Sequence, residues 1–153
     1  MALLGNIIWF LMGGWLLFIV YTLAAILFFP VFVPIFRIAR YSLFPFGKSI
    51  VSQDELNNYR ESQGSPTENS TAKRLSGVLN IVWMLTFGWV LALTHLVASI
   101  LNLCLFFLIV TIPNIGGHFK MIRIAFMPFN KVIVPKALAE EIEVGIAKGK
   151  LKI

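Results

Sequence analysis

The chain has 153 residues, 58% of them hydrophobic and 13% charged, with a formal net charge of +6. Its mean hydropathy of +0.84 is far above what a soluble domain of this length needs, so the composition excludes an ordinary soluble globular protein. Residues 1–36 and 75–119 contain no Lys, Arg, Asp or Glu, and this segregation predicts an integral membrane protein.

The first uncharged block holds enough chain to cross a bilayer. A hydrocarbon core of roughly 30 Å needs about 20 apolar residues in a helix, so the block suffices for one span and nearly for two. A signal peptide is disfavoured because the block has no basic N-terminal region and contains Trp9 and Trp15. Glycine frees the backbone, so Gly14 and Trp15 are the predicted corner of a helical hairpin with one short and one long limb.

A short basic segment follows this block. Arg37 and Arg40 are three residues apart, so they share one face of a helix over residues 36–43 whose other positions are mainly apolar. We predict an amphipathic helix at the boundary of membrane and cytoplasm, ended by the Pro45-Phe46-Gly47 turn. With Lys48, these cations are candidate contacts for anionic lipid head groups; alternatively, they act only as topology determinants.

Residues 52–71 change character completely. They carry Asp54, Glu55, Glu61 and Glu68 among Asn, Gln, Ser, Gly and Pro. This composition is typical of a solvated, partly mobile cytoplasmic linker, and a regulatory loop is the alternative.

The second half of the chain repeats the first. The pattern Asn-x-x-Trp, followed by Gly-Trp, starts at Asn6 and returns 74 positions later at Asn80. The basic segment returns at an offset of 83, because the second copy carries nine extra residues before Pro113. The repeat predicts a second hairpin with its corner at Gly88 and Trp89; a corner within residues 95–102 would instead give two fuller spans. The predicted units are the first repeat (residues 1–51), the polar linker (52–74), the second repeat (75–134) and a C-terminal helix (135–153).

The second basic segment sets the expected topology. Lys120 and Arg123 lie on a predicted helix over residues 119–126, and Lys131 follows its Pro128-Phe129-Asn130 turn. If both basic segments lie in the cytoplasm, the second block crosses the membrane an even number of times. By symmetry, both termini are then cytoplasmic. The alternative is a single pass in the first block with the N-terminus outside.

The chain ends in a predicted cytoplasmic helix. Pro135 opens this segment, its acidic residues come early and its lysines late, as the helix dipole prefers. Leu138, Ile142 and Ile146 share one side. We expect that side to pack on the protein or on a neighbouring subunit.

These features together resemble a known family. The Asn-x-x-Trp and Gly-Trp openings, Thr111-Ile112-Pro113, the Pro-Phe endings and Asp54-Glu55-Leu56 are similar to those of the bacterial YccF inner-membrane proteins, which are built from two such domains. Asn114 and Asn130 stand where that family usually has glycine. The resemblance implies a multi-pass protein of the bacterial inner membrane with no assigned enzymatic activity, and it supplies no catalytic residues.

The sequence contains no recognisable catalytic or metal-binding motif. Cys104 is the only cysteine, and His95 and His118 have no further ligands at metal-binding spacing. There is no phosphate loop, no nucleophile elbow and no His-Glu-x-x-His. We therefore expect no enzyme, metal or cofactor. The cations flank apolar blocks, which indicates membrane anchoring and no nucleic-acid partner.

Uncharged polar residues within the second block carry the functional hypotheses. Such groups are costly at membrane depth unless they meet water or each other, so they either line a permeation path or join helices by hydrogen bonds. They are Asn80, Thr94, His95, Ser99 and Asn102. The apolar blocks contain no carboxylate, which argues against a coupled transporter. Because one chain is too small to enclose a pore, we expect a homo-oligomer for passive ion or solute permeation, with a structural or lipid-interacting membrane protein as the alternative.

Overall fold

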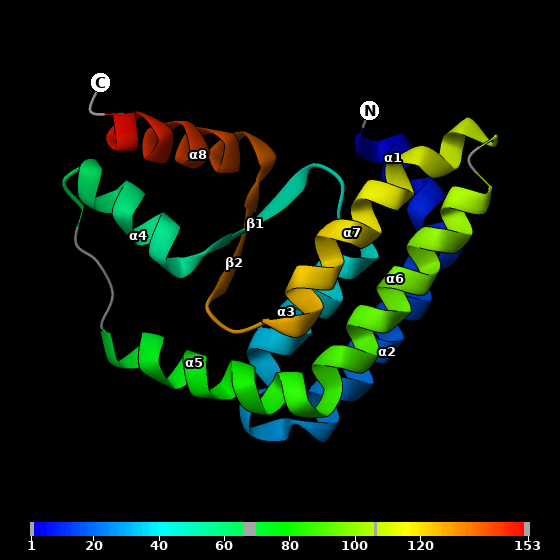
Figure 1. The fold of residues 1–153 in the computed structure, drawn as a ribbon, viewed down its shortest axis with the longest axis horizontal. Helices are drawn as coiled ribbons and strands as arrows, with labels where there is room; N and C mark the ends of the chain where they lie inside the picture. Colours follow the sequence, from blue (N-terminus) through cyan, green and yellow to red (C-terminus); the bar gives the residue numbers. More distant parts are fainter. Residues whose placement is uncertain (1, 66–69, 106, 152–153) are drawn as a thin grey trace.

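The computed structural model describes residues 2–65, 70–105 and 107–151, and these are mainly helical (Figure 1). The first copy contains α1 (Ala2–Trp9), a π-helical segment (Phe10–Gly14), α2 (Trp15–Leu27), a 3-10 turn (Phe29–Val31), α3 (Phe32–Leu43) and β1 (Lys48–Ser52), and α4 (Gln53–Ser62) follows. The second contains α5 (Ser70–Trp83), a π-helical segment (Met84–Gly88), α6 (Trp89–Cys104), a 3-10 turn (Ile109–Thr111), α7 (Ile112–Phe126) and β2 (Lys131–Pro135), and α8 (Lys136–Leu151) ends the chain.

Two helices in the described part are long and apolar enough to cross a membrane. They are Ala2–Leu27 and Lys73–Cys104. Only 28% of the most apolar window of each is buried, and side chains such as Leu11 and Leu85 are 73% and 71% exposed. A core helix of a soluble protein would bury most of such a surface. The exposed apolar faces therefore suit lipid contact, as the composition predicted.

The structure places the turns of the paired helices away from the predicted corners. Gly14 and Gly88 have helical dihedral angles and lie within or at the end of π-helical segments, where the long helices bend, and Gly13 has a φ of 116°. The antiparallel partners are α2 with α3 and α6 with α7 (Figure 1). Their connections contain the 3-10 turns Phe29–Val31 and Ile109–Thr111. The alternative corner within residues 95–102 lies inside α6.

The reason lies in the two tryptophan pairs. Trp15 and Trp89, the tryptophans of the predicted corners, are 46% and 52% exposed on the outer surface. Trp9 and Trp83 are buried instead, and each ring occupies the space beside the glycine five positions later in the chain. Glycine at residues 14 and 88 therefore makes room for a ring rather than reversing the chain.

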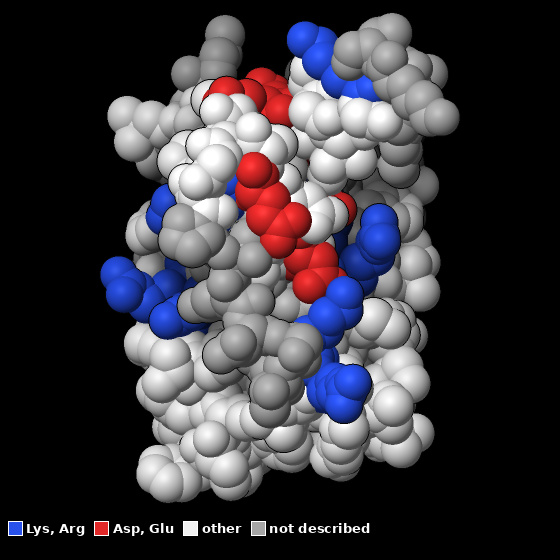
Figure 2. Space-filling view, turned by 90° about the vertical axis from the view of Figure 1, so that its left-hand side faces the viewer, with Lys and Arg blue, Asp and Glu red and all other residues white. Residues whose placement is uncertain are grey.

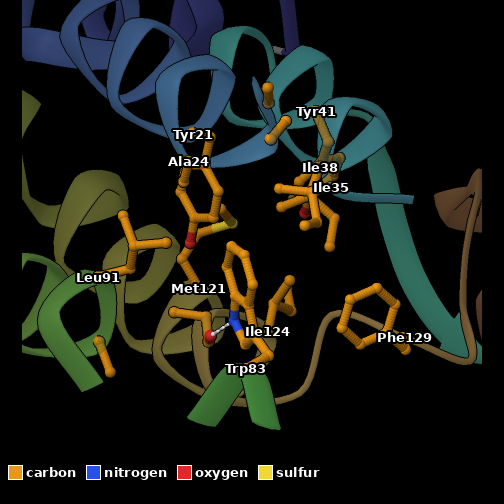
Figure 3. Close-up of a cluster of buried hydrophobic side chains, with 14 residues drawn as sticks. Tyr21, Ala24, Ile35, Ile38, Tyr41, Trp83, Leu91, Met121, Ile124 and Phe129 are labelled. Atoms are coloured by element: carbon orange, nitrogen blue, oxygen red, sulfur yellow. Dashed lines mark hydrogen bonds between the residues drawn. The ribbon is translucent and has the colours of Figure 1, made fainter. Parts of the chain in front are cut away.

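The predicted basic helices are parts of α3 and α7, and their apolar residues pack inside the protein. Ile35 and Ile38 of α3 and Met121 and Ile124 of α7 are buried in a core shared by both copies (Figure 3). Trp83 of α5 lies in the same core. The two copies thus fold around one set of apolar side chains.

A two-stranded antiparallel sheet, which the sequence did not predict, joins the ends of the two copies. β1 pairs with β2, and Ile50 lies opposite Ile133 at the centre. These two residues are 83 positions apart, which is the offset between the basic segments. Ile50 and Ile133 therefore occupy equivalent positions in the two copies and also pair with each other. This is expected for two copies related by an approximate two-fold axis.

The predicted linker begins with a helix. Ser52 caps α4: its side chain accepts a hydrogen bond from the Glu55 backbone N–H at 3.1 Å, and Glu55 Oε2 accepts one from the Ser52 N–H at 2.7 Å. Such a reciprocal capping box satisfies two amides that would otherwise lack partners. Residues 66–69 of the predicted linker lie outside the described residues.

The predicted C-terminal helix is present as α8. Its apolar side packs on the same chain rather than on a neighbouring subunit, because Ile142 and Ala139 form a small core with Val51, Leu56 and Val134. This core seats α4 and α8 beside the sheet (Figure 1).

Candidate functional site: a buried polar stripe and two basic pockets

A stripe of buried polar side chains lies between α6 and α7. His95, Ser99 and Asn102 are spaced four and three apart, which places them on one face of α6. Asn114 and His118 lie likewise on α7. All five side chains are buried, with exposed fractions between 0% and 6%. We call these five residues, with Tyr21 of α2, the polar stripe.

A hydrogen-bond chain of Tyr21, His95 and His118 forms one end of the polar stripe. The Tyr21 hydroxyl lies 3.1 Å from His95 Nε2, and His95 Nδ1 lies 3.1 Å from His118 Nδ1. Two facing ring nitrogens bond only if one carries the proton and the other accepts it. The chain can therefore run in either of two opposite donor directions between Tyr21 and His118.

The rest of the stripe bonds mainly to nearby carbonyls. Ser99 Oγ donates to the Ile115 carbonyl at 3.3 Å, and Asn102 Nδ2 donates to the Ala98 carbonyl at 2.8 Å. Asn114 Nδ2 lies 3.1 Å from the sulfur of Met12, which belongs to the first copy. The side-chain oxygens of Asn102 and Asn114 are buried without a hydrogen-bond partner.

Two of the predicted polar residues lie outside the stripe. Thr94 is exposed, and its hydroxyl donates to the Val90 carbonyl of its own helix at 2.9 Å. Asn80 instead holds the end of the second basic segment: its side chain accepts from the Phe129 N–H at 3.0 Å and donates to the Phe129 carbonyl at 3.3 Å. Asn6 makes the equivalent pair of bonds to Phe46, at 2.9 and 3.1 Å.

The tryptophan of the Asn-x-x-Trp pattern adds a further hydrogen bond near the same turn in each copy. We call the asparagine and tryptophan bonds of a copy together its clamp. Trp9 Nε1 donates to the Ser42 carbonyl at 2.7 Å, and Trp83 Nε1 donates to the Ala125 carbonyl at 2.8 Å (Figure 3). Both acceptors are carbonyls near the end of the helix that precedes the Pro-Phe turn. The repeated pattern is therefore explained by the same backbone contacts in each copy.

Sequence reasoning missed Tyr21 and Asn114 and considered His118 only as a metal ligand. The signal was present, because residues 111, 114 and 118 repeat at helical spacing just as 95, 99 and 102 do. At the matching positions the first copy carries Val31 for Asn114, Ile35 for His118 and Ala25 for Ser99. The fold thus tolerates apolar residues at these three positions, and all residues of the polar stripe except Tyr21 belong to the second copy.

The six cations predicted to contact lipid line two pockets, and each pocket takes its three cations from one copy. Arg37, Arg40 and Lys48 line a cavity of about 310 Å³, which we call the copy-one pocket. Lys120, Arg123 and Lys131, their equivalents at an offset of 83, line the copy-two pocket, of about 290 Å³. Seen from the side that bears α4, α8 and the strands, basic side chains lie on both margins of a central run of acidic ones, above an uncharged surface (Figure 2).

The two pockets differ in their acidic residues. Glu55 and Glu143 line the copy-two pocket, whereas no acidic residue lines the copy-one pocket. Hydrogen bonds from the backbone amide and then the hydroxyl of Ser52, followed by the charges of Lys131 and Arg123, lower the pKa of Glu55 below its ordinary value. Glu55 therefore stays ionised beside the cations of its pocket.

No metal centre accompanies these sites in the part of the chain that the structure describes. No three His, Cys, Asp or Glu side chains gather there. Cys104 is an exposed free cysteine near the end of α6.

Comparison with known proteins gives a consistent result. A family model described as the YccF inner membrane component domain matches residues 4–48 and 78–131. The chain is 31% identical over 142 residues to the inner membrane protein YccF of Escherichia coli (strain K12), with 88% of each chain covered. The protein of the same name in Shigella flexneri gives the same values. No solved structure matches significantly.

Proposed function

This chain belongs to the YccF family of inner-membrane proteins, and from that premise we propose that it is a non-transport, accessory component of the bacterial membrane. The observation that carries the proposal is the burial of the polar stripe within one protomer. His95 is fully buried and Ser99 is 1% exposed, and both bond to groups of the same chain. Residues that line a water-filled path would keep an open face.

The polar stripe suits a role in holding helices together. Interhelical hydrogen bonds in membranes contribute about 0.6 kcal/mol each on average, so several along one interface favour a single helix arrangement. His95 links α6 to α2 and α7 at once, and Ser99 links α6 to α7. His95, Ser99 and His118 find partners within the same chain, which weakens the argument for an oligomer that rested on buried polar groups.

Strand pairing supports a multi-pass topology with both basic segments on one side. β1 and β2 follow the two basic segments, and strands that are hydrogen-bonded to each other lie on the same side of a membrane. The positive-inside tendency then favours the cytoplasmic side for β1, β2, α4 and α8. In this arrangement α1 and α2 lead into the membrane and α3 returns, and α5, α6 and α7 repeat that path.

One observation favours a second candidate, a channel-like homo-oligomer for passive permeation. Asn102 and Asn114 each bury a side-chain oxygen without a hydrogen-bond partner. They lie at the end of the polar stripe away from Tyr21. Buried unpaired acceptors are costly and are often satisfied by water. The exposed apolar faces of α2 and α6 offer surfaces on which protomers could assemble.

A liposome experiment separates the two candidates. Purified protein is reconstituted, its mass in detergent is measured by native mass spectrometry, and ion and small-solute fluxes are compared with those of empty liposomes. The accessory role predicts no added flux. Flux in the parent protein that Asn102→Leu abolishes, with folding and mass unchanged, would overturn the proposal in favour of the channel.

A further inference from the structure

We propose that the copy-one pocket, formed by Arg37, Arg40 and Lys48, is a binding site for a phosphate group. This inference is independent of whether the protein conducts ions. Arg37 and Arg40 project from one face of α3, and Lys48 begins β1 after the turn, so three cations from two elements border one cavity of about 310 Å³. A cluster of arginines with a lysine matches the charge and hydrogen-bond geometry of a phosphate.

No acidic residue in the described part of the chain forms an ion pair with these cations. Within the described ranges, Lys73 pairs with Asp54 at 3.0 Å and Lys136 pairs with Glu140 at 3.4 Å, and neither pair involves the copy-one pocket. Three like charges around one cavity repel each other, and an anion relieves that repulsion. The pocket therefore carries a positive charge that no described acidic residue balances.

Besides the three cations, Tyr41 and three apolar residues line the copy-one pocket. Leu43, Phe44 and Ile133 stand beside the three cations, and Phe44 is 43% exposed. A surface that places cations next to apolar side chains fits the phosphate of an anionic lipid together with the start of its acyl chains. A free phosphate ion would use only the cations.

The copy-two pocket provides a comparison within the same molecule. It has the equivalent cations Lys120, Arg123 and Lys131, but Glu55 and Glu143 also line it. Two carboxylates offset most of the charge of three cations and repel an approaching anion. Phosphate should accordingly prefer the copy-one pocket, although general attraction to an anionic membrane would act on both.

A binding experiment on the full-length protein in detergent tests this preference. The thermal unfolding midpoint is followed while dihexanoyl-phosphatidylglycerol, dihexanoyl-phosphatidylcholine or inorganic phosphate is added. Phosphatidylglycerol should raise the midpoint of the parent and of the control Lys120→Gln/Arg123→Gln. In Arg37→Gln/Arg40→Gln the apparent affinity should fall by about tenfold or more, since hydrogen bonds to charged groups typically contribute about 1.5–3 kcal/mol.

The three probes distinguish the sources of the phosphate. If only phosphatidylglycerol raises the thermal unfolding midpoint, the site binds an anionic lipid. If inorganic phosphate raises the midpoint as much as phosphatidylglycerol does, the site binds a soluble phosphate. No rise with any probe overturns the proposal, as does an equal loss in both double variants. If Arg37→Gln/Arg40→Gln does not fold, Lys48→Gln, at an exposed strand end, replaces it and should weaken binding by itself.

Discussion

The Tyr21 hydroxyl and His95 Nε2 lie 3.1 Å apart, and these two residues are repeat equivalents, 74 positions apart. Residues that are equivalent in two copies and also touch each other lie close to the axis that relates the copies. Ile50 and Ile133 do the same in the sheet. The approximate two-fold axis therefore passes near both pairs, one in the helical core and one beside α4 and α8.

Tyr21→Phe should destabilise the protein. The change keeps the ring but removes the partner of His95 Nε2, and leaving a buried polar group unpaired costs about 1–3 kcal/mol. The measurement is the free energy of unfolding in detergent. Ser99→Ala, which installs the residue found at the matching position of the first copy, should cost less, and equal costs would contradict a central role for the Tyr21–His95 bond.

Neighbouring glycines of α7 should respond in opposite ways to alanine. A Cβ at Gly117 would lie 2.6 Å from the Trp9 ring, which is fixed by its bond to Ser42, whereas a Cβ at Gly116 would meet no atom within 4 Å. Overpacking costs about 1–3 kcal/mol, while alanine gains up to about 1 kcal/mol over glycine within a helix.

We therefore expect Gly117→Ala to lower the thermal unfolding midpoint and Gly116→Ala to leave it unchanged or raise it. The two residues share a helix and a membrane depth, so each serves as the control for the other. A similar response at both would mean that Trp9 does not pack against Gly117.

Asn80→Leu should weaken the clamp on the second basic segment. The change leaves the Phe129 N–H and carbonyl without their side-chain partners, and we expect a loss of about 1–3 kcal/mol in the free energy of unfolding. Thr94→Val is the control, because Thr94 is exposed and bonds only within its helix. If Asn80 instead lined a permeation path, the substitution would alter flux with little effect on stability.

The sequence was sufficient to predict a mainly helical membrane protein of this family, with two apolar blocks long enough to cross a bilayer. Charge segregation and the repeat are properties of the chain itself, so they are visible without a structure. The place of the helix turns was not predictable in the same way. Gly14 has the same sequence signal whether it reverses the chain or makes room for the Trp9 ring, and only the tertiary contact decides between them.

The sheet and α4 were missed for different reasons. β1 and β2 are short segments whose pairing joins residues 83 positions apart, and short apolar runs alone do not predict a strand. The start of α4, by contrast, carried a local signal: Ser52 followed three residues later by Glu55 is the capping-box pattern. The acidic composition of the linker obscured it.

Acidification should loosen the start of α4. The folded state lowers the pKa of Glu55, so this group adds stability above its unfolded pKa, which is about 4.3, and the contribution is lost as pH falls through the lower folded value. Hydrogen exchange of the first α4 amides should increase over that range. Glu55→Ala should show fast exchange at neutral pH already, with little further change on acidification.

Cysteines at Ile50 and Ile133 should form a disulfide under mild oxidation, in a background where Cys104 is replaced by Ser. The two residues face each other across the sheet, where Cβ atoms lie about 4.5–5.5 Å apart, close to disulfide geometry. Cysteines at Lys48 and Lys131 are the control: Lys48 pairs with Pro135, so Lys131 lies four residues along the strand, about 13 Å away. A cross-link in the control but not in the Ile50 and Ile133 pair would contradict the register.

The same disulfide, formed in intact cells, would place both basic segments on one side of the membrane. Labelling of single cysteines at Gln63 and Glu140 should then report one common side. Opposite labelling of Gln63 and Glu140 would rule out an even number of crossings in the second copy.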